Sequence, residues 1–243
     1  MRHGSGPDTI NGKQDILMKN KLSAVLFAAA ALLGCAGCGS AESGSAGEPD
    51  QRVFGFYYNW YGNTEVNGKE VHWGHGVIGN NSYDGPADYI PGVDNIAANF
   101  YPELKNYSST DPATVARHVE MMAKARIGVA VVTWWGDNDF GSPALPVLFD
   151  QAAKHGMKVC FHIEPYHDRN PENLRANIAK LLGRYGSHPA FYRMAGRPCF
   201  FIYDSYITPA SEWARLLQPD GDLTIRGTEL DAVMIGLWVK EHE

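Results

Sequence analysis

The chain has 243 residues, of which 44% are hydrophobic, 12% aromatic and 20% charged, and its formal net charge is −6. This apolar content excludes an intrinsically disordered chain, and 21 Lys and Arg residues against 27 Asp and Glu argue against a nucleic-acid-binding surface. The length allows one large α/β domain or two small ones.

Residues 1–34 have the pattern of a bacterial export signal. A short basic start at 18–21 precedes the apolar run 22–33, which has the length of a signal-peptide core and is too short to span a membrane. The run leads into Leu-Leu-Gly-Cys35, which resembles a lipobox, in which the cysteine is lipidated and becomes the mature N-terminus. We expect an exported bacterial lipoprotein at the cell surface or in the periplasm, held to the membrane only by the lipid on Cys35. The alternative is a plain signal peptide that is cleaved nearby.

Residues 35–51 are predicted to be a Gly/Ser-rich tether, and strands and helices alternate over residues 52–243. The first strand is predicted at 53–58, and a long loop follows it to about Asp111. Helices are predicted at 112–126, 143–155, 171–185 and 209–217, and further strands at 129–134, 158–164, 198–203 and 230–235. Strands that are almost continuously apolar and alternate with helices predict a parallel sheet covered by helices.

Aromatic and ionisable residues gather where these strands end. They occur in the segments 57–60, 133–135, 162–166 and 203–206, whereas no glycine-rich nucleotide-binding motif follows a strand. Functional groups at the carboxyl ends of successive strands are typical of a (β/α)8 TIM barrel. The sequence predicts five strands where such a barrel needs eight. We therefore interpret residues 52–243 as the N-terminal part of an α/β barrel, with about five βα units, and expect about three more units after Glu243.

The strand at 158–164 gives the strongest indication of a site. Side-chain alternation puts its branched and aromatic apolar residues on the helix-facing side, and it puts Cys160, His162 and Glu164 on the other side. A carboxylate at a buried strand end is unfavourable unless it is hydrogen-bonded or functional. We therefore expect Glu164 to point into the barrel mouth and to bind a ligand there. The alternative is that Glu164 caps the backbone amides of a neighbouring loop.

Several rings near the strand ends suit a sugar ligand, because a flat ring packs well against the apolar face of a pyranose. Tyr58 ends the predicted first strand and Trp60 follows it, while Trp134 ends the second strand and Trp135 follows it. Two adjacent tryptophans point to opposite faces, so at most one of them lines the mouth while the other fills the core.

Neither histidines nor cysteines give a metal motif. His72 and His75 are three residues apart in the first loop, but a third ligand is missing, and hydrogen bonding to sugar hydroxyls is the better use of these side chains. Cys160 and Cys199 lie in apolar runs and are predicted to be buried thiols, although an exported protein could pair them. We expect no metal and no cofactor.

Six segments, in this order, resemble the endo-α-1,2-mannosidase and endo-α-1,2-mannanase family, glycoside hydrolase family 99. They are FYYNWYGN (56–63), VHWGH (71–75), FYPEL with YSSTDP (100–104 and 107–112), FHIEPY (161–166), YGSHPAFYR (185–193) and YDSYIT (203–208). The resemblance runs from about Phe54 to the end of the chain. It implies a (β/α)8 barrel that cleaves internal α-mannosidic linkages with retention of configuration. The implied substrate is α-mannan or a mannose-rich oligosaccharide.

The resemblance also implies a mechanism whose catalytic residues are missing from this chain. In that family one carboxylate deprotonates the sugar's 2-hydroxyl, which attacks the anomeric carbon to give a 1,2-anhydro sugar, and a carboxylic acid protonates the leaving oxygen. Both groups come from a Glu-Trp-His-Glu motif. The segment Lys240-Glu-His-Glu243 looks similar but lacks the Trp, and we interpret it as a solvated helix start. We therefore expect the catalytic pair beyond Glu243 and no activity from this chain alone.

Roles in substrate binding are implied at matched positions. Glu164 matches a glutamate that binds the sugar beside the cleaved bond, Trp134 matches a tryptophan that stacks on the neighbouring sugar, and Tyr58 would lie close to the reacting sugar. The full set of predicted substrate-binding residues is Tyr58, Trp60, His72, Trp134, Glu164, Tyr166, Tyr203 and Asp204. The alternative function is a non-catalytic mannan-binding lipoprotein or an inactive fragment.

Overall fold

The computed structural model describes residues 47–74, 96–98 and 100–237. The fold described here is that of the unit formed by residues 44–243. The export signal with Cys35, the loop residue His75 and the segment 240–243 lie outside the described residues, so the expectations about them stay predictions.

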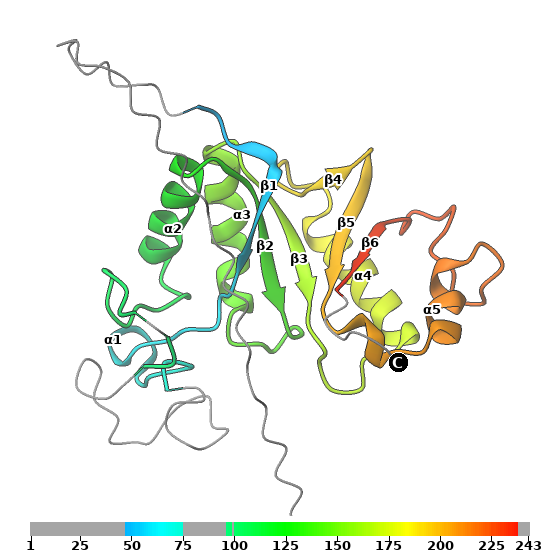
Figure 1. The fold of residues 1–243 in the computed structure, drawn as a ribbon, viewed down its shortest axis with the longest axis horizontal. Helices are drawn as coiled ribbons and strands as arrows, with labels where there is room; N and C mark the ends of the chain where they lie inside the picture. Colours follow the sequence, from blue (N-terminus) through cyan, green and yellow to red (C-terminus); the bar gives the residue numbers. More distant parts are fainter. Residues whose placement is uncertain (1–46, 75–95, 99, 238–243) are drawn as a thin grey trace, which may run out of the picture. The chain divides into compact units, whose positions relative to one another are not determined.

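A parallel sheet forms the centre of the fold, with strands in the order β1, β2, β3, β5, β6 (Figure 1). Their bounds are Asp50–Tyr57, Ile127–Trp134, Lys158–Ile163, Arg197–Ile202 and Val233–Gly236. A two-residue strand, β4 (Arg193–Met194), pairs antiparallel with the start of β5. Five parallel strands are thus present among the described residues, as the sequence predicts.

One long helix follows each of the first four parallel strands. These helices are α2 (Pro112–Lys124), α3 (Leu145–Lys154), α4 (Pro171–Tyr185) and α5 (Ala210–Leu217). Local signals explain their starts: Asp111 accepts hydrogen bonds from the first amides of α2, and Asn170 forms a capping box before α4. Proline occupies the first turn of α2, α3 and α4, where its missing N–H is not needed.

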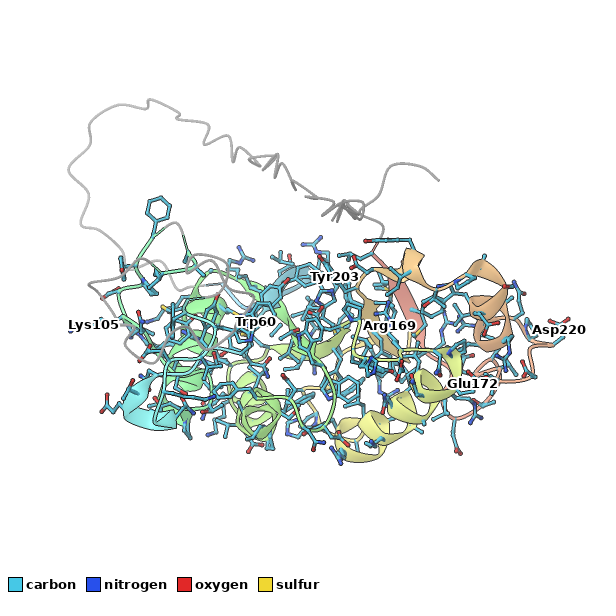
Figure 2. All side chains as sticks on the ribbon, turned by 90° about the horizontal axis from the view of Figure 1, so that it is seen from below. Trp60, Lys105, Arg169, Glu172, Tyr203 and Asp220 are labelled. Atoms are coloured by element: carbon cyan, nitrogen blue, oxygen red, sulfur yellow. The ribbon has the colours of Figure 1, made fainter. Side chains whose placement is uncertain are left out.

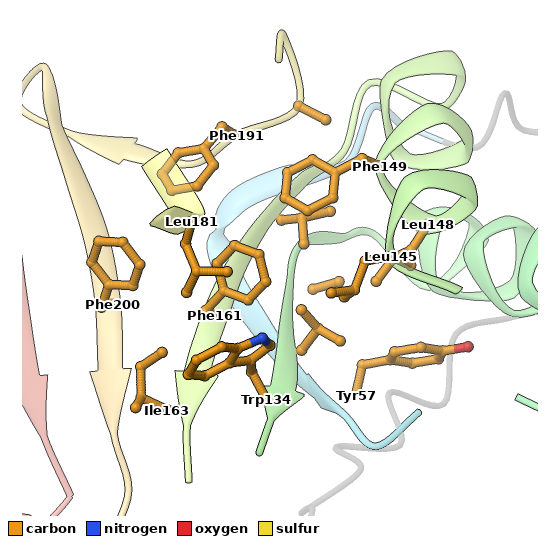
Figure 3. Packing of buried hydrophobic residues seen from close by; sticks show 14 of the residues in the cluster. Tyr57, Trp134, Leu145, Leu148, Phe149, Phe161, Ile163, Leu181, Phe191 and Phe200 are labelled. Atoms are coloured by element: carbon orange, nitrogen blue, oxygen red, sulfur yellow. The ribbon is translucent and has the colours of Figure 1, made fainter. Parts of the chain in front are cut away.

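Side chains alternate across the sheet and build two separate apolar layers. On one side Val132, Phe161 and Phe200 pack with Phe149 and Leu181 of the helices (Figure 3). The other side holds a smaller cluster, whose members include Val131, Tyr192 and the two cysteines Cys160 and Cys199. Both thiols are free and buried, as predicted. The predicted alternation of the third strand is confirmed, because Val159, Phe161 and Ile163 join the helix-side core and Cys160 joins the opposite cluster.

The structure corrects several predicted boundaries. β1 begins at Asp50, so two residues assigned to the tether belong to the sheet, and the strand ends one residue before Tyr58. The predicted second helix is a 3-10 turn (Ser142–Ala144) followed by α3. The first loop contains a one-turn helix, α1 (Thr64–Asn67), which the sequence analysis missed together with β4 and a 3-10 turn at Ser205–Ile207. No helix among the described residues is long and apolar enough to cross a membrane.

Both edges of the sheet are open in the described part of the chain. β1 pairs only with β2, and β6 pairs only with β5. Grooves of about 370 and 190 Å³ run beside these edges, the first bordered by Phe56 and Met121 and the second by Trp213 and Met234. Unpaired strand edges next to apolar surface favour association with other chains.

We therefore expect the 243-residue chain, produced by itself, to self-associate. Val53→Lys places a charge on the exposed edge strand β1 and should raise the monomer fraction in size-exclusion chromatography with light scattering. Ile207→Lys, at an exposed position outside the strands, is the matched control and should leave the monomer fraction unchanged. A monomer of the unsubstituted chain with one sharp cooperative melting transition would contradict this expectation.

Candidate functional site

The candidate site lies where the parallel strands end. Tyr58 follows β1, Glu164 follows β3 and Tyr203 follows β5, while Thr133 is the penultimate residue of β2. Thr133 is the direct register partner of His162 on β3. Because the strands are parallel, all of these positions meet at one end of the sheet (Figure 1).

Glu164 is buried, with 2% of its surface exposed. The hydroxyl of Thr133 donates a short hydrogen bond of 2.5 Å to Oε1 of Glu164, and Nδ1 of His162 lies 3.2 Å from the same oxygen. No backbone amide of the described residues donates to the Glu164 carboxyl group. The contacts therefore do not support the alternative that Glu164 caps a loop, and they agree with a carboxylate that points to the inner face of the sheet.

The His162 side chain packs between this carboxyl group and two aromatic rings. Its ring lies 4.8 Å from that of Phe56 and 5.3 Å from that of Tyr203, measured between centroids. Burial raises the pKa of the Tyr203 hydroxyl, and the charges of Asp204 and Glu164 raise it further. His162 therefore lies between the Glu164 carboxyl group and the Tyr203 ring and is near both.

Three of the predicted residues form one stack of rings beside Glu164. Tyr58 and Trp60 lie 4.7 Å apart between ring centroids, and Trp60 and His72 lie 4.5 Å apart and almost parallel, at 7°. Tyr58 remains 38% exposed. The pKa of its hydroxyl is raised first by burial and then by the charge of Glu164, so the stack begins near the carboxylate. An exposed ring next to a buried acceptor can receive the apolar face and a hydroxyl of the same sugar.

Arg169 ties the ends of β3 and β5 together, although the sequence analysis gave it no role. Its guanidinium donates to the carbonyl oxygens of Tyr203 at 2.7 Å, Asp204 at 2.9 Å and Ile163 at 3.3 Å.

Asp204 adopts a left-handed backbone conformation, with φ 46°, and its Oδ1 is buried without a hydrogen-bond partner among the described residues. In the view onto the strand ends, Trp60, Tyr203 and Arg169 lie toward the middle, and Lys105 and Asp220 lie farther out (Figure 2).

The prediction that Trp134 stacks on a sugar is corrected by its position. Trp134 shares the helix-facing side with Ala130 and Val132, and it is 2% exposed within that core (Figure 3). Its ring packs edge-on against Tyr166, with 5.7 Å between centroids. An indole enclosed in this way offers no free face to a ligand.

Tyr166 also faces the helices rather than the ring stack. Its hydroxyl donates to Asn173 and accepts from Asn177, both on α4. Of the eight predicted residues, the structure thus groups Tyr58, Trp60, His72, Glu164 and Tyr203 around one site, with Asp204 adjoining it. It sets Trp134 and Tyr166 on the other side of the sheet.

Trp135, the second tryptophan of the pair, directly follows the last residue of β2. It is partly exposed, and its indole N–H is buried without a hydrogen-bond partner among the described residues. The parity argument in the sequence allowed only one of the two tryptophans to face the site. The structure encloses Trp134 in the helix-side core, so by this argument Trp135 is the tryptophan that is left to line the mouth.

Asp139 is a further carboxylate near the site that the sequence analysis missed. Its pKa is raised first by burial and then by the charge of Glu164. The loop that carries it packs tightly on the first loop: a Cβ at Gly141 would lie 2.3 Å from the Asn59 side chain, and one at Gly62 would lie 2.8 Å from the Phe140 ring. The signal in the sequence is the polar, glycine-flanked segment 136–141 directly after a strand.

The described residues contain no group of three or more His, Cys, Asp or Glu side chains that could hold a metal ion. His75, which the sequence analysis considered with His72, lies outside them.

The parallel sheet, the helices that follow its strands and the polar residues at the strand ends are arranged as in an α/β barrel. A family model described as glycosyl hydrolase family 99 matches residues 49–243, and the chain belongs to this family. It is 41% identical over 204 residues to glycoprotein endo-alpha-1,2-mannosidase of Rattus norvegicus, covering 78% of this chain and 44% of that protein. For the protein of the same name from Xenopus laevis the identity is 40%, with 79% and 46% covered.

Solved structures agree with this assignment. A GH99 endo-alpha-mannosidase from Bacteroides thetaiotaomicron superposes with a TM-score of 0.70 at 47% sequence identity, covering 79% of this chain and 56% of that one. The likeness confirms the predicted fold class, an incomplete (β/α)8 barrel. The chain spans about half the length of the curated relatives it matches.

The electrostatic contact between Glu164 and Asp139 gives a direct test of this site. Glu164→Gln removes a negative charge that disfavours ionisation of Asp139, so the pKa of Asp139 should fall toward its ordinary value. Carboxyl ¹³C NMR titration measures this shift. Asp137 is the control, because Lys180 and Arg184, and not Glu164, lower its pKa. The pKa of Asp137 should therefore stay the same in Glu164→Gln. An unchanged pKa of Asp139 would mean that the two carboxyl groups are not neighbours.

Proposed function

We propose that this chain supplies the sugar-binding part of a retaining endo-α-mannosidase or endo-α-mannanase site. The observation that carries the proposal is the buried carboxyl group of Glu164, held beside the exposed ring of Tyr58 and its stack with Trp60 and His72. Family membership and relatives named endo-alpha-1,2-mannosidase support an α-mannoside as the ligand. The proposed substrate class is α-mannan or a mannose-rich oligosaccharide.

In this proposal the sugar lies between an acceptor and a set of rings. A hydroxyl of the mannose beside the cleaved bond donates to Glu164, and the apolar face of a pyranose packs against Tyr58 or Trp135. Charge-assisted hydrogen bonds are about twice as strong as neutral ones, and ring stacking adds on the order of 1 kcal/mol beyond area burial. The hydrogen bond to Glu164 thus orients the sugar, and packing on the ring fixes the plane of the pyranose.

The chemical step is proposed to follow the 1,2-anhydro-sugar route. A carboxylate removes the proton of the 2-hydroxyl, the 2-oxygen forms a bond to the anomeric carbon, and the bond to the leaving oxygen breaks as an acid protonates it. Water then opens the anhydro ring, which gives overall retention. We propose that this pair of acids belongs to the Glu-Trp-His-Glu motif in the part of the relatives' length that this chain does not cover.

Glu164→Gln tests the function. We expect the protein, as its whole gene encodes it, to bind α-mannose oligosaccharides and to release fragments from α-mannan. Glu164→Gln should weaken binding measured by isothermal titration calorimetry by about 10-fold or more, because a charged acceptor is lost. Lys105→Gln, well away from the strand ends, is the control and should bind normally. Binding without release would favour the non-catalytic mannan-binding alternative, and no binding to any α-mannoside would contradict the proposal.

The two adjacent tryptophans give a separate prediction. Trp135→Ala should weaken binding of α-mannose oligosaccharides by about 5- to 10-fold while leaving the melting temperature nearly unchanged, because a partly exposed stacking ring is lost. Trp134→Ala should lower the free energy of unfolding by about 3–5 kcal/mol, because it empties a buried core position. Calorimetric binding and denaturant unfolding measure the two effects. The reverse pattern would show that Trp134 is the ligand-facing ring.

A further inference from the structure

Three polar side chains are buried together on the side of the sheet that faces away from the helix-side core. Thr133, His162 and Glu164 are each 1–2% exposed, and apolar or aromatic residues such as Phe56 lie next to them. A polar group in such a place is unfavourable by about 1–3 kcal/mol if it lacks a partner. The positions follow from the fold, because Thr133 and His162 are register partners on β2 and β3 and Glu164 follows His162 by two residues on the same face.

All the polar contacts of the Glu164 carboxyl group within this cluster fall on one oxygen. The Thr133 hydroxyl donates to Oε1 at 2.5 Å, and Nδ1 of His162 lies 3.2 Å from Oε1. Nδ1 of His162 makes no hydrogen bond to this oxygen, so Thr133 is the hydrogen-bond donor to Oε1. Oε2 accepts no hydrogen bond from any described residue.

We propose that Thr133 is a positioning residue, which holds Oε1 of Glu164 so that Oε2 is presented to a sugar hydroxyl. This inference rests on the proposed function of Glu164. A free glutamate side chain has three rotatable torsions, and ordering them on binding reduces affinity. The hydrogen bond from Thr133 orders the carboxyl group in advance and fixes the direction of its second oxygen. Thr133 therefore acts on the ligand only through Glu164.

A pair of substitutions at residue 133 separates this role from packing. Thr133→Val keeps the shape and β-branching of the side chain but removes the donor, whereas Thr133→Ser keeps the donor. In the protein as its whole gene encodes it, we expect Thr133→Val to weaken binding of an α-mannose oligosaccharide by about 10-fold in calorimetry. Thr133→Ser should bind within about threefold of the unsubstituted protein.

A double-mutant cycle with Glu164→Gln shows whether Thr133 acts through Glu164. In the Glu164→Gln background, Thr133→Val should change binding by less than about twofold, because the group that it positions has already lost its charge. A 10-fold loss in both backgrounds, or no loss in either, would overturn the positioning role. So would failure of Thr133→Ser to restore binding.

The same experiment distinguishes failure of the two proposals. If the unsubstituted protein binds and Glu164→Gln does not, but Thr133→Val binds normally, then the function stands and the positioning role is wrong. If the unsubstituted protein binds no α-mannoside, the proposed function is wrong, and the ligand-directed role of Thr133 falls with it. His162→Phe, which keeps the ring contacts with Phe56 and Tyr203, should weaken binding less than Thr133→Val.

Discussion

The buried carboxyl group of Glu164 is the constraint on which the site depends. A carboxyl group so shielded from water needs a partner of its own, and Thr133 on the neighbouring strand supplies a hydrogen-bond donor at 2.5 Å. This partner is available only because β2 and β3 run parallel with Thr133 beside His162. The apolar contacts of the helix-side core hold the two strands in that register, so packing on one face of the sheet determines polar geometry on the other.

The loops that surround Glu164 are fixed by a second set of contacts. Arg169 binds carbonyl oxygens at the ends of both β3 and β5, which holds Tyr203 and Asp204 in place. The loop after β2 packs on the loop after β1 through Gly141 and Gly62, where no larger residue would fit without displacement. The ends of β3 and β5 are thus linked to each other, and so are the loops that follow β1 and β2. If the site binds a sugar as we propose, such mutually supported elements spare it the cost of first ordering its own side chains.

Much of this architecture could be predicted from the sequence because its signals are local. The bounds of α4 match the prediction, since Asn170 and Pro171 mark its start and Gly186 follows its end. The short elements α1 and β4 were missed because two to four residues give no periodic pattern. The fold class followed from the strand–helix alternation and from functional groups placed after each strand.

The site was predicted less completely, for reasons of geometry. Trp134 was matched by motif, but only the structure shows that Trp134 lies in the helix-side core and that its neighbour Trp135 is partly exposed. Thr133 gave no signal because threonine is common in strands, and its role depends on a partner on another strand. Arg169 acts through hydrogen bonds to the end of another strand, and Asp139 is affected by the charge of Glu164, which follows another strand; spacing along the chain encodes neither.

The most direct measurement is a crystal structure of the protein with a bound α-linked mannose disaccharide. We predict a sugar hydroxyl within hydrogen-bond distance of Oε2 of Glu164, a pyranose face against Tyr58 or Trp135, and an intact hydrogen bond from Thr133 to Oε1. A disaccharide bound elsewhere, or a Glu164 carboxyl group that makes no contact with it, would contradict the account.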